Sequence, residues 1–522
     1  MGQRTYNIIF HTHTVSGIVI SVALYVIFFA GSFSFFRDEI ANWERGHTVT
    51  VQDEIPEDID SVLDNIGKEY KLHGRDVEIS HYFNERKINV NLGGSKDTLA
   101  TENDKKGSFF YYDTADGTHS TYQESYNLGE FLYRLHFLDQ IPYPYGRYLS
   151  GFVAFFFLFA IFTGIVVHWK KIIPNFYLFR PWAKLKTLWT DAHTALGVIG
   201  FPFQFVYAVT GAFFLLKILL VAPSVFTLYD GDESKLYEDL EYNHPIFEFE
   251  NEPLQGAIDV NTYIQKTKKD WPGFKVTEAH IFNYGDVNMH VSISGNMDYR
   301  SKFNGTGYTI YNVANDSIVQ QKNPLKSASY LNGVKNTLYR LHLGDYAGLA
   351  LRVVSFVLGL ISCFVIISGI MIWLVARDKK HLPEKRRRFN RNVVRCYLAI
   401  CLGMYPITAL EFILVKVFQP EAGKSFIYST YFVGWLLLSI FFILKNNNGF
   451  TNMYTLLSGS ILGLLIPIVN GFVTNNWFWK SYSNGFSQIF FIDVFWIVLS
   501  LVGFWVVVML NKNEKQKILA ET

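Results

Sequence analysis

Four histidines occupy matching places in the two halves of the sequence, each beside a long apolar run. The pentapeptide LYRLH appears at Leu132–His136 and again at Leu338–His342. A second pattern, His-Thr-x-x-Gly, appears at His13–Gly17 and at His193–Gly197. Neutral imidazole is the commonest metal ligand in proteins. These histidines are therefore candidate ligands, and their duplication indicates that they act in pairs.

The pairing predicts two shared cofactors. A polar side chain near hydrocarbon costs free energy unless it has a partner. Haem iron takes axial imidazoles, helix bundles build such sites from facing helices, and a flat apolar macrocycle packs well among Phe and Leu. We therefore predict two bis-histidine haems, an inner one between His13 and His193 and an outer one between His136 and His342. No Cys-x-x-Cys-His motif is present for covalent attachment.

Four arginines accompany the outer histidines. Arg134 and Arg340 lie two residues before them, and Arg147 and Arg352 lie near the start of the apolar run that follows. Arginine binds carboxylates through a bidentate fork. For any single arginine, anchoring at the membrane interface is an equal alternative. For the matched set we favour binding of haem propionates.

One further histidine complicates the inner pair. His168 lies at the inner end of the second predicted span, where the other half of the sequence has Trp373 at the matching offset. His168 is therefore an alternative inner ligand in place of His13 or His193.

The elements that position these residues are membrane helices. Half of the 522 residues are hydrophobic and only 18% are charged, which indicates membrane spans alternating with water-facing segments. A span needs about 20 mostly apolar residues. The first apolar run lacks a signal-peptide cleavage pattern, so we expect a retained helix. The eight predicted spans are 14–36, 148–169, 194–217, 348–376, 395–418, 427–444, 454–472 and 487–510.

Positive charge predicts the orientation of the spans. The loops KKIIPNFYLFRPWAKLKTLW, after the second span, and RDKKHLPEKRRRFNRNVVR, after the fourth, are basic and should be cytoplasmic. Both termini then lie in the cytoplasm, and segments 37–147 and 218–347 are exported. In a bacterium this predicts an inner-membrane protein with two periplasmic segments.

The sequence therefore predicts a duplicated, mainly α membrane protein. Each half is a helix, an exported segment, an LYRLH box and a second helix, so the repeats run parallel. Each exported segment has a helical pattern followed by alternating strand patterns, typical of a small α+β domain. The predicted segments are 1–36 (helix 1), 37–147 (exported domain 1), 148–217 (helices 2 and 3), 218–347 (exported domain 2), 348–394 (helix 4 and a basic loop) and 395–522 (a four-helix module of unknown role).

The C-terminal module contains no histidine and few charges. Glu411 and Asp493 stand inside its apolar runs, and carboxylates in a membrane are functional candidates by default. We favour the simpler interpretation that each lies near an interface or pairs internally. The chain also lacks P-loop and G-x-G-x-x-G motifs that would indicate its own nucleotide or flavin domain.

Several of these stretches resemble the PepSY-associated transmembrane family. The run HTVSGIVISVALYVIFFAGSFSFFRDEI resembles the first helix of that family. The two LYRLH boxes, the run DAHTALGVIGFPFQFVYAVTGAFF and the helix-plus-strand segments, which resemble PepSY domains, extend the similarity to about residue 380. The resemblance implies an iron-regulated inner-membrane protein, similar to reductases that release iron from ferric siderophores through two b-type haems. The matching histidines are His13, His136, His193 and His342.

The sequence also departs from this resemblance. The flavodoxin and reductase region that ends some relatives is absent, and the last four helices lie outside the shared pattern. A cytoplasmic flavoprotein reductase or a quinol in the membrane lipid is then the expected electron donor. The leading hypothesis is a di-haem oxidoreductase acting on a ferric chelate, with no role in nucleic-acid binding. The alternatives are a non-redox PepSY-type binding or regulatory protein and a transporter.

The basic loops make the orientation testable. Reporter fusions after Asp53 and Asp259 should report an exported location, and a fusion after Lys385 should report a cytoplasmic one. The physical reason is the excess of Lys and Arg that retains short loops on the cytoplasmic side. An exported signal at Lys385 would reverse the predicted layering of the histidines.

Overall fold

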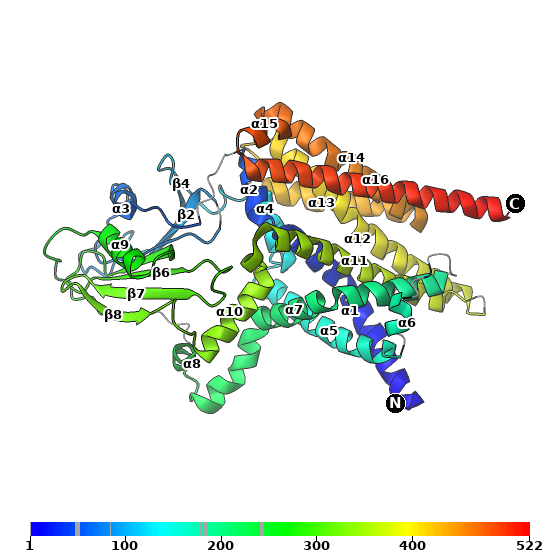
Figure 1. Ribbon diagram of the computed structural model, residues 1–522, viewed down its shortest axis with the longest axis horizontal. Coiled ribbons are helices and arrows are strands. Elements are labelled where there is room, and N and C mark those ends of the chain that lie inside the picture. Colours follow the sequence, from blue (N-terminus) through cyan, green and yellow to red (C-terminus); the bar gives the residue numbers. More distant parts are fainter. Residues whose placement is uncertain are drawn as a thin grey trace. The chain divides into compact units, whose positions relative to one another are not determined.

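A computed structural model of the chain describes residues 2–46, 53–83, 85–170, 172–177, 180, 185–240, 245–379 and 381–521. Its contacts divide the chain into two compact units, each built from both halves of the sequence. The helical unit contains Met1–Thr48, Asn127–Val221 and Ala350–Thr522, and the sheet unit contains Val49–Tyr126 and Ala222–Leu349. Figure 1 shows the long helices of the first and the strands of the second.

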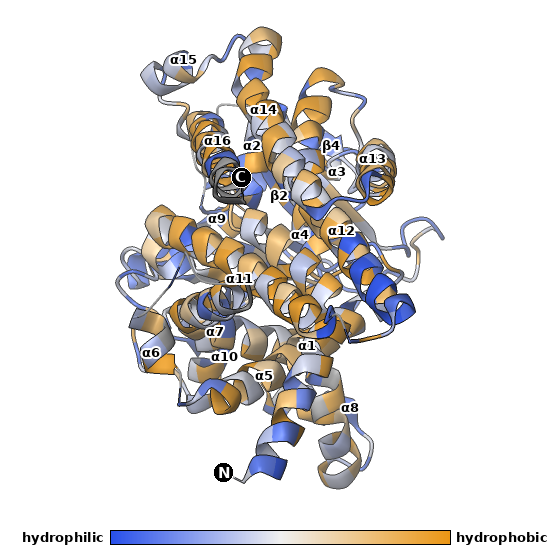
Figure 2. Ribbon diagram, turned by 90° about the vertical axis from the view of Figure 1, so that its right-hand side faces the viewer, coloured by the Kyte–Doolittle hydropathy of each residue, from blue (hydrophilic) through white to orange (hydrophobic). Residues whose placement is uncertain are grey.

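Within the described residues, eight helices are long and apolar enough to cross a membrane, which confirms the predicted number. Figure 2 shows apolar residues along these helices and a hydrophilic stretch at the start of α12. The long helices are α1 (Gln3–Ser34), α5 (Tyr145–His168), α7 (Leu185–Leu228), α11 (Gly348–Arg377), α12 (Glu384–Val417), α13 (Lys424–Lys445), α14 (Asn448–Thr474) and α16 (Ser487–Glu521). The short helices are α2 (Arg37–Arg45), α4 (Leu128–His136), α6 (Ile172–Tyr177), α8 (Glu233–Asp239), α10 (Tyr330–Leu343), the 3-10 helix η1 (Asp345–Ala347) and α15 (Phe478–Ser483).

The first and third long helices begin earlier than their apolar runs. α1 begins at Gln3 and α7 at Leu185, so His13 and His193 each lie in about the third turn of a helix rather than at its start. No Pro or Gly interrupts the polar residues before either histidine within these helices. Helical backbone geometry therefore fixes both side chains.

The predicted exported segment 37–147 is divided between the two units. Its first helix, α2, has Ile40 and Trp43 fully buried and contacts α4, α12 and α16. Both α2 and α4 belong to the helical unit. The predicted boundaries differ here because each of these short helices is amphipathic and buries its apolar side against longer helices.

The sheet unit confirms a helix followed by antiparallel strands in each segment. The first segment contributes α3 (Ile59–Gly67), β1 (Val77–Ser80), β2 (Lys87–Leu92), β3 (Ser108–Asp113) and β4 (His119–Ser120). The second contributes α9 (Val260–Asp270), β5 (Lys275–Phe282), β6 (His290–Asn296), β7 (Thr306–Asn312) and β8 (Ser317–Lys322).

The two segments form one sheet rather than two separate domains. The strand order is β4-β3-β2-β1-β5-β6-β7-β8, and β1 pairs antiparallel with β5, with Val77 opposite Ile281 and Ile79 opposite Ala279. These four side chains are fully buried in the core. Each first strand would otherwise present a row of unpaired backbone groups at an edge. Pairing the two strands satisfies both edges at once.

Helices α3 and α9 of the sheet unit cap each other at their N-termini. Asp60 accepts hydrogen bonds from the backbone N–H of Val260 (2.9 Å) and Asn261 (3.1 Å). In return, Asn261 Oδ1 accepts from the backbone N–H of Ile59 at 2.8 Å. Because the first turn of a helix has N–H groups without intrahelical partners, this exchange stabilises both helices. The two halves therefore share a core and helix caps.

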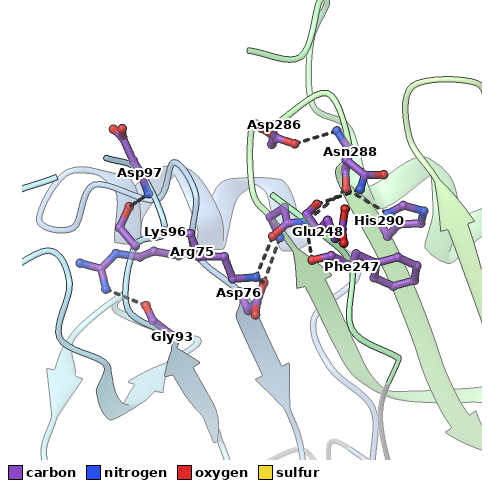
Figure 3. A network of polar contacts seen from close by, with 12 residues as sticks. Arg75, Asp76, Gly93, Lys96, Asp97, Phe247, Glu248, Asp286, Asn288 and His290 are labelled. Atoms are coloured by element: carbon purple, nitrogen blue, oxygen red, sulfur yellow. Dashed lines mark hydrogen bonds and ion pairs between the residues drawn. The ribbon is translucent and has the colours of Figure 1, made fainter. Parts of the chain in front are cut away.

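A network of polar contacts joins the strands near this seam (Figure 3). Lys96 Nζ donates to Asp76 (2.8 Å) and to Asn283 (2.7 Å), which links the two segments. Asp286 accepts from the backbone N–H groups of Glu250, Glu252 and Asn288 at 2.8–3.3 Å. Asp286 is fully buried, and its carboxylate is one of the groups that hold the segment before α9 against the sheet.

Replacing Asp286 with Ala should release that segment. Three part-buried backbone N–H groups would lose their acceptor, at a cost of roughly 1–3 kcal/mol. Amide hydrogen exchange at Glu250, Glu252 and Asn288 should become about 5- to 150-fold faster. The matched control is Asp64→Ala on α3, since Asp64 is exposed and lies in a helix, where Ala is well tolerated. Unchanged exchange in Asp286→Ala would show that other contacts hold the segment.

Candidate functional site

Three histidines meet at one level of the helical unit. His13 of α1 and His193 of α7 have ring centroids 6.4 Å apart, with the ring planes at 70°. His168, the last residue of α5, is also 6.4 Å from His193, with the planes at 50°. The structure therefore brings the predicted inner pair together and adds the predicted alternative ligand beside it. His193 is common to both possible pairs.

A backbone carbonyl of a neighbouring helix orients the His13 ring. Its Nδ1 lies 3.0 Å from the carbonyl oxygen of Ala160 and 3.3 Å from Thr163 Oγ1, both on α5. A carbonyl can only accept, so Nδ1 carries the proton and donates. Nε2 then has the lone pair. This is the arrangement that metal-ligating histidines usually show.

The His193 ring is oriented in the same way by α11. Its Nδ1 donates to the carbonyl oxygen of Val365 at 2.9 Å and lies 3.0 Å from Ser368 Oγ. Ala160 and Val365 stand at equivalent places in the repeat, as do Thr163 and Ser368. The duplication has therefore preserved the hydrogen-bond partners of the ring as well as the histidine.

A glycine beside each carbonyl makes room for the ring. A Cβ atom at Gly164 would lie 3.1 Å from His13 Cε1, and a Cβ atom at Gly369 would lie 3.3 Å from His193 Cε1. Each glycine follows the accepting carbonyl by four residues, so it lies one turn further along the same helix face. A side chain at either position would push the imidazole back by a few tenths of an ångström.

The predicted outer ligand His136 is positioned by the same two contacts, a backbone carbonyl and a glycine. Its Nδ1, on α4, donates to the carbonyl oxygen of Ile27 at 3.2 Å. A Cβ atom at Gly31, again four residues later, would lie 2.6 Å from that Nδ1. Burial lowers the pKa of His136, so its ring is neutral near pH 7, which is the form that binds metals.

The inner geometry fits a metal held between two imidazoles. Two rings that bind one ion from opposite sides through bonds of about 2 Å have their centres roughly 6 Å apart. The 6.4 Å separations match this value. Among the described residues, no group of three or more His, Cys, Asp and Glu side chains is arranged to share an ion. A bis-histidine cofactor such as haem needs only a pair.

Two predicted arginines share one carboxylate. Arg134 donates to Asp139 at 2.6 Å and to Glu130 at 2.7 Å, and Arg147 donates to Asp139 at 2.7 Å. Burial opposes the ionisation of Asp139, but hydrogen bonds from Arg147 and Arg134 outweigh it and lower its pKa. Asp139 is therefore an anion that organises both arginines. The propionate role of these arginines stays a prediction.

The other two arginines also have carboxylate partners. Arg352 forms a bidentate pair with Glu39 of α2, at 2.7 and 3.1 Å. In the sheet unit, Arg340 pairs with Asp345 and lies 3.9 Å from the centre of the Tyr299 ring. His342 belongs to α10 of that unit, so its pairing with His136 stays a prediction.

Sequence reasoning missed two sets of residues that position the predicted ones. Asp139 and Asp345 each follow an LYRLH histidine by three residues, so the repeat extends to LYRLH-x-x-Asp. The motif Thr/Ser-Gly-Ile occurs at Thr163–Ile165 and Ser368–Ile370, where it supplies the hydroxyl and the glycine beside each inner histidine. Aligning the two halves beyond the histidines would have found both.

Glu411 and Asp493 of the C-terminal module are fully buried. Asp493 accepts from Trp43 Nε1 at 2.8 Å and from Asn470 Nδ2 at 3.0 Å, and Glu411 accepts from Thr430 at 2.7 Å. Internal pairing, the simpler prediction, therefore describes Asp493. One carboxylate oxygen of Glu411 is paired in this way, with the Thr430 hydroxyl.

Residues 10–376 match one described protein family, the PepSY-associated TM region. The chain belongs to this family. A relative, an uncharacterized protein of Pseudomonas aeruginosa, is 24% identical over 297 residues, which cover 54% of this chain and 71% of the relative. As a PepSY-associated TM protein, the chain is a multi-pass membrane protein. The matched region contains all the predicted histidines and ends in α11.

The glycines beside the histidines provide a sharp test in this PepSY-associated TM protein. Gly164→Ala should displace the His13 ring because the added methyl group would lie 3.1 Å from Cε1. We expect haem bound per protein to fall several-fold at the inner site. The control is Gly333→Ala on α10, since the nearest atom to a Cβ there, Asn304 Nδ2, would lie at an ordinary contact distance of 3.9 Å. Ala favours a helix over Gly by about 1 kcal/mol, so the control should remain stable and keep its cofactor. Equal haem content in the two variants would show that Gly164 does not affect haem binding at the inner site.

Proposed function

We propose that this chain is a di-haem b oxidoreductase of the bacterial inner membrane that reduces a ferric chelate, such as a ferric siderophore, on the periplasmic side. The observation that carries this proposal is the inner histidine geometry. His13 and His193 each keep Nε2 available while a neighbouring helix holds Nδ1, and their rings have the separation expected for two axial ligands.

The proposed ligands follow the repeat. His13 and His193 would hold the inner haem, with His168 as the alternative partner of His193. His136 and His342 would hold the outer haem. When bound, haem supplies reversible one-electron chemistry whose potential depends on its axial ligands and surroundings.

The chain itself sets the spacing of the two sites. On α1, His13 and Gly31 are 18 residues apart, which corresponds to about 27 Å along a helix. The hydrocarbon core of a bilayer is about 30 Å thick. Because His136 lies against Gly31, this spacing supports one site in each leaflet. Phe28, three residues before Gly31, packs against Phe157 and Phe203 in an aromatic cluster.

The electron donor would be a partner. The sequence contains no flavin or nucleotide motif, so a cytoplasmic flavoprotein reductase or a membrane quinol is the proposed source. The second candidate function is a non-redox PepSY-type binding or regulatory protein. The exposed aromatic side chains of the sheet unit, Tyr82 (64% exposed) and Phe109 (49%), favour a binding role and also suit docking of a chelate. A transporter is the third candidate.

Haem content of single variants tests the proposal. Purified protein made with adequate haem supply should contain two haems with split α and β bands on reduction. His193→Ala should lose about half of the haem because His193 belongs to both possible inner pairs. His13→Ala and His168→Ala then identify its partner, since only one of them should match that loss. The control is His11→Ala, an exposed residue on the same helix as His13. A colourless wild-type protein would exclude the electron-transfer function.

A further inference from the structure

A groove lies between three helices of the helical unit, α1, α11 and α12. Its volume is about 380 Å³, within the range of roughly 300–1,000 Å³ that ligand sites have. Three of its lining residues, Val22, Phe389 and Val393, are 36–64% exposed, so the groove is open along one side. The lining is mainly apolar and includes Ile18, Val22, Ile370, Trp373, Val393 and Ile400.

The groove lies within the membrane-spanning part of these helices, beside the inner histidines. All three helices are long and apolar enough to cross a membrane. Ile370 directly follows Gly369, at which a Cβ atom would lie 3.3 Å from His193 Cε1. The open side of the groove therefore faces lipid rather than water, and an apolar chain is the occupant that its walls suit.

The segment that connects α11 to α12 is strongly basic. Residues 377–395 contain nine Lys and Arg residues and two acids. Asp378 accepts from Arg387 at 2.7 Å and from Arg391 at 3.0 Å, and Glu384 accepts from the same two arginines. Both acids are therefore already neutralised. Figure 2 shows the resulting hydrophilic stretch at the start of α12.

Two of the remaining cations continue the face of α12 that lines the groove. Lys385 and Arg386 are exposed and have no ion-pair partner in the part of the chain that the structure describes. Residues 3, 4, 7 and 11 apart stand on one face of a helix. At these intervals Lys385 is followed by Phe389, Asn392 and Cys396, which line the groove. Arg386 is followed in the same way by Phe389, Val393 and Tyr397, which also line it.

A third cation stands at the same end on α11. The Arg377 Cζ atom lies 5.1 Å from the centre of the Trp373 ring, which lines the groove. Asp378, the next residue, binds Arg387 of α12, so the end of α11 lies against the start of α12. Trp is enriched at the interface between membrane and water. Arg377, Lys385 and Arg386 therefore stand where lipid headgroups lie.

Orientation of the spans does not account for this placement. Retaining a loop on the cytoplasmic side requires an excess of Lys and Arg, but it requires neither a groove nor cations on the helix face that lines one. Basic pockets between membrane helices bind the headgroups of anionic lipids. A neutral quinone would fill the apolar groove but would leave the three cations without a counter-charge.

We propose that this groove binds an anionic phospholipid. One acyl chain lies between α1, α11 and α12, and the phosphate group lies between Arg377 of α11 and Lys385 and Arg386 of α12. Asn392, which is exposed and lines the groove, can donate to the headgroup from the same face. The binding is non-covalent and involves no chemical step.

Lipid binding is independent of the proposed redox function. Arg377, Lys385 and Arg386 all lie beyond residues 10–376, the region that matches the family. Binding of the lipid is measured without electron transfer, so the lipid site and the haem sites can each fail without the other.

Native mass spectrometry of the full-length protein tests the proposal. Delipidated protein in a neutral detergent is titrated with phosphatidylglycerol or with phosphatidylcholine that carries the same acyl chains. The wild type should bind the first phosphatidylglycerol at least several-fold more tightly than phosphatidylcholine. Lys385→Gln and Arg386→Gln should each weaken phosphatidylglycerol binding about 5-fold and leave phosphatidylcholine binding unchanged, because each removes one charge near the phosphate.

Two further variants separate the site from general charge attraction. The matched control is Lys445→Gln, since Lys445 is exposed at the end of α13, the span that returns to the side where α12 begins. None of the described lining residues belongs to α13, so this variant should bind phosphatidylglycerol as the wild type does. Val393→Trp adds bulk at a partly exposed lining position and removes no charge. It should weaken phosphatidylglycerol binding several-fold.

Each contrary result would overturn the proposal. Equal affinity of the wild type for the two lipids would remove the role of the cations, and an equal loss in Lys445→Gln would leave only general charge attraction. Wild-type affinity in Val393→Trp would place the acyl chain elsewhere. Competition by glycerol 3-phosphate at the lipid's own concentration would show a phosphate site without a chain. Retention of a neutral quinone in place of phosphatidylglycerol would assign the groove to the quinone.

Discussion

A hydrogen bond from an imidazole to a backbone carbonyl of the next helix determines the arrangement of the helical unit. It occurs at His13, His193 and His136, and each time a glycine stands one turn beyond the accepting carbonyl. The bond fixes which ring nitrogen carries the proton, and the glycine fixes how closely the two helices approach. The positions of the helices and the chemistry of the rings therefore depend on one contact, and the repeat has kept it in both halves.

The sequence predicted the parts of this arrangement that are local. Long apolar runs and matched histidines can be recognised in a single segment, and they led to the helices and to the inner pair. The carbonyls of Ala160 and Val365 could not be predicted in this way, because every residue has a carbonyl and only the packed structure shows which one accepts. The pairing of β1 with β5 was missed for a related reason, since strand patterns indicate strands but not their partners across a long separation.

In the C-terminal module, too, the sequence indicates which residues are unusual but not which residues they contact. Asp493 was visible as a carboxylate in an apolar run, yet its partner Trp43 is 450 residues away on a short helix that composition assigned to an exported domain. Lys416 lies near the end of an apolar run, and its ammonium group is buried against Trp43 and Glu44. Thus α2 links the duplicated core to the added helices through polar contacts as well as through its buried apolar face.

The continuous sheet also imposes an order on biosynthesis. Val77 pairs with Ile281, so β1 is synthesised about 200 residues before its partner strand. At roughly 5–20 residues per second, the β1 edge waits about 10–40 s while α5 and α7 are threaded into the bilayer. An uncovered strand edge invites pairing with other chains during this interval. Maturation of this protein therefore depends on protection of a half-built sheet until its second half arrives, and neither half of the duplication is a self-sufficient folding unit.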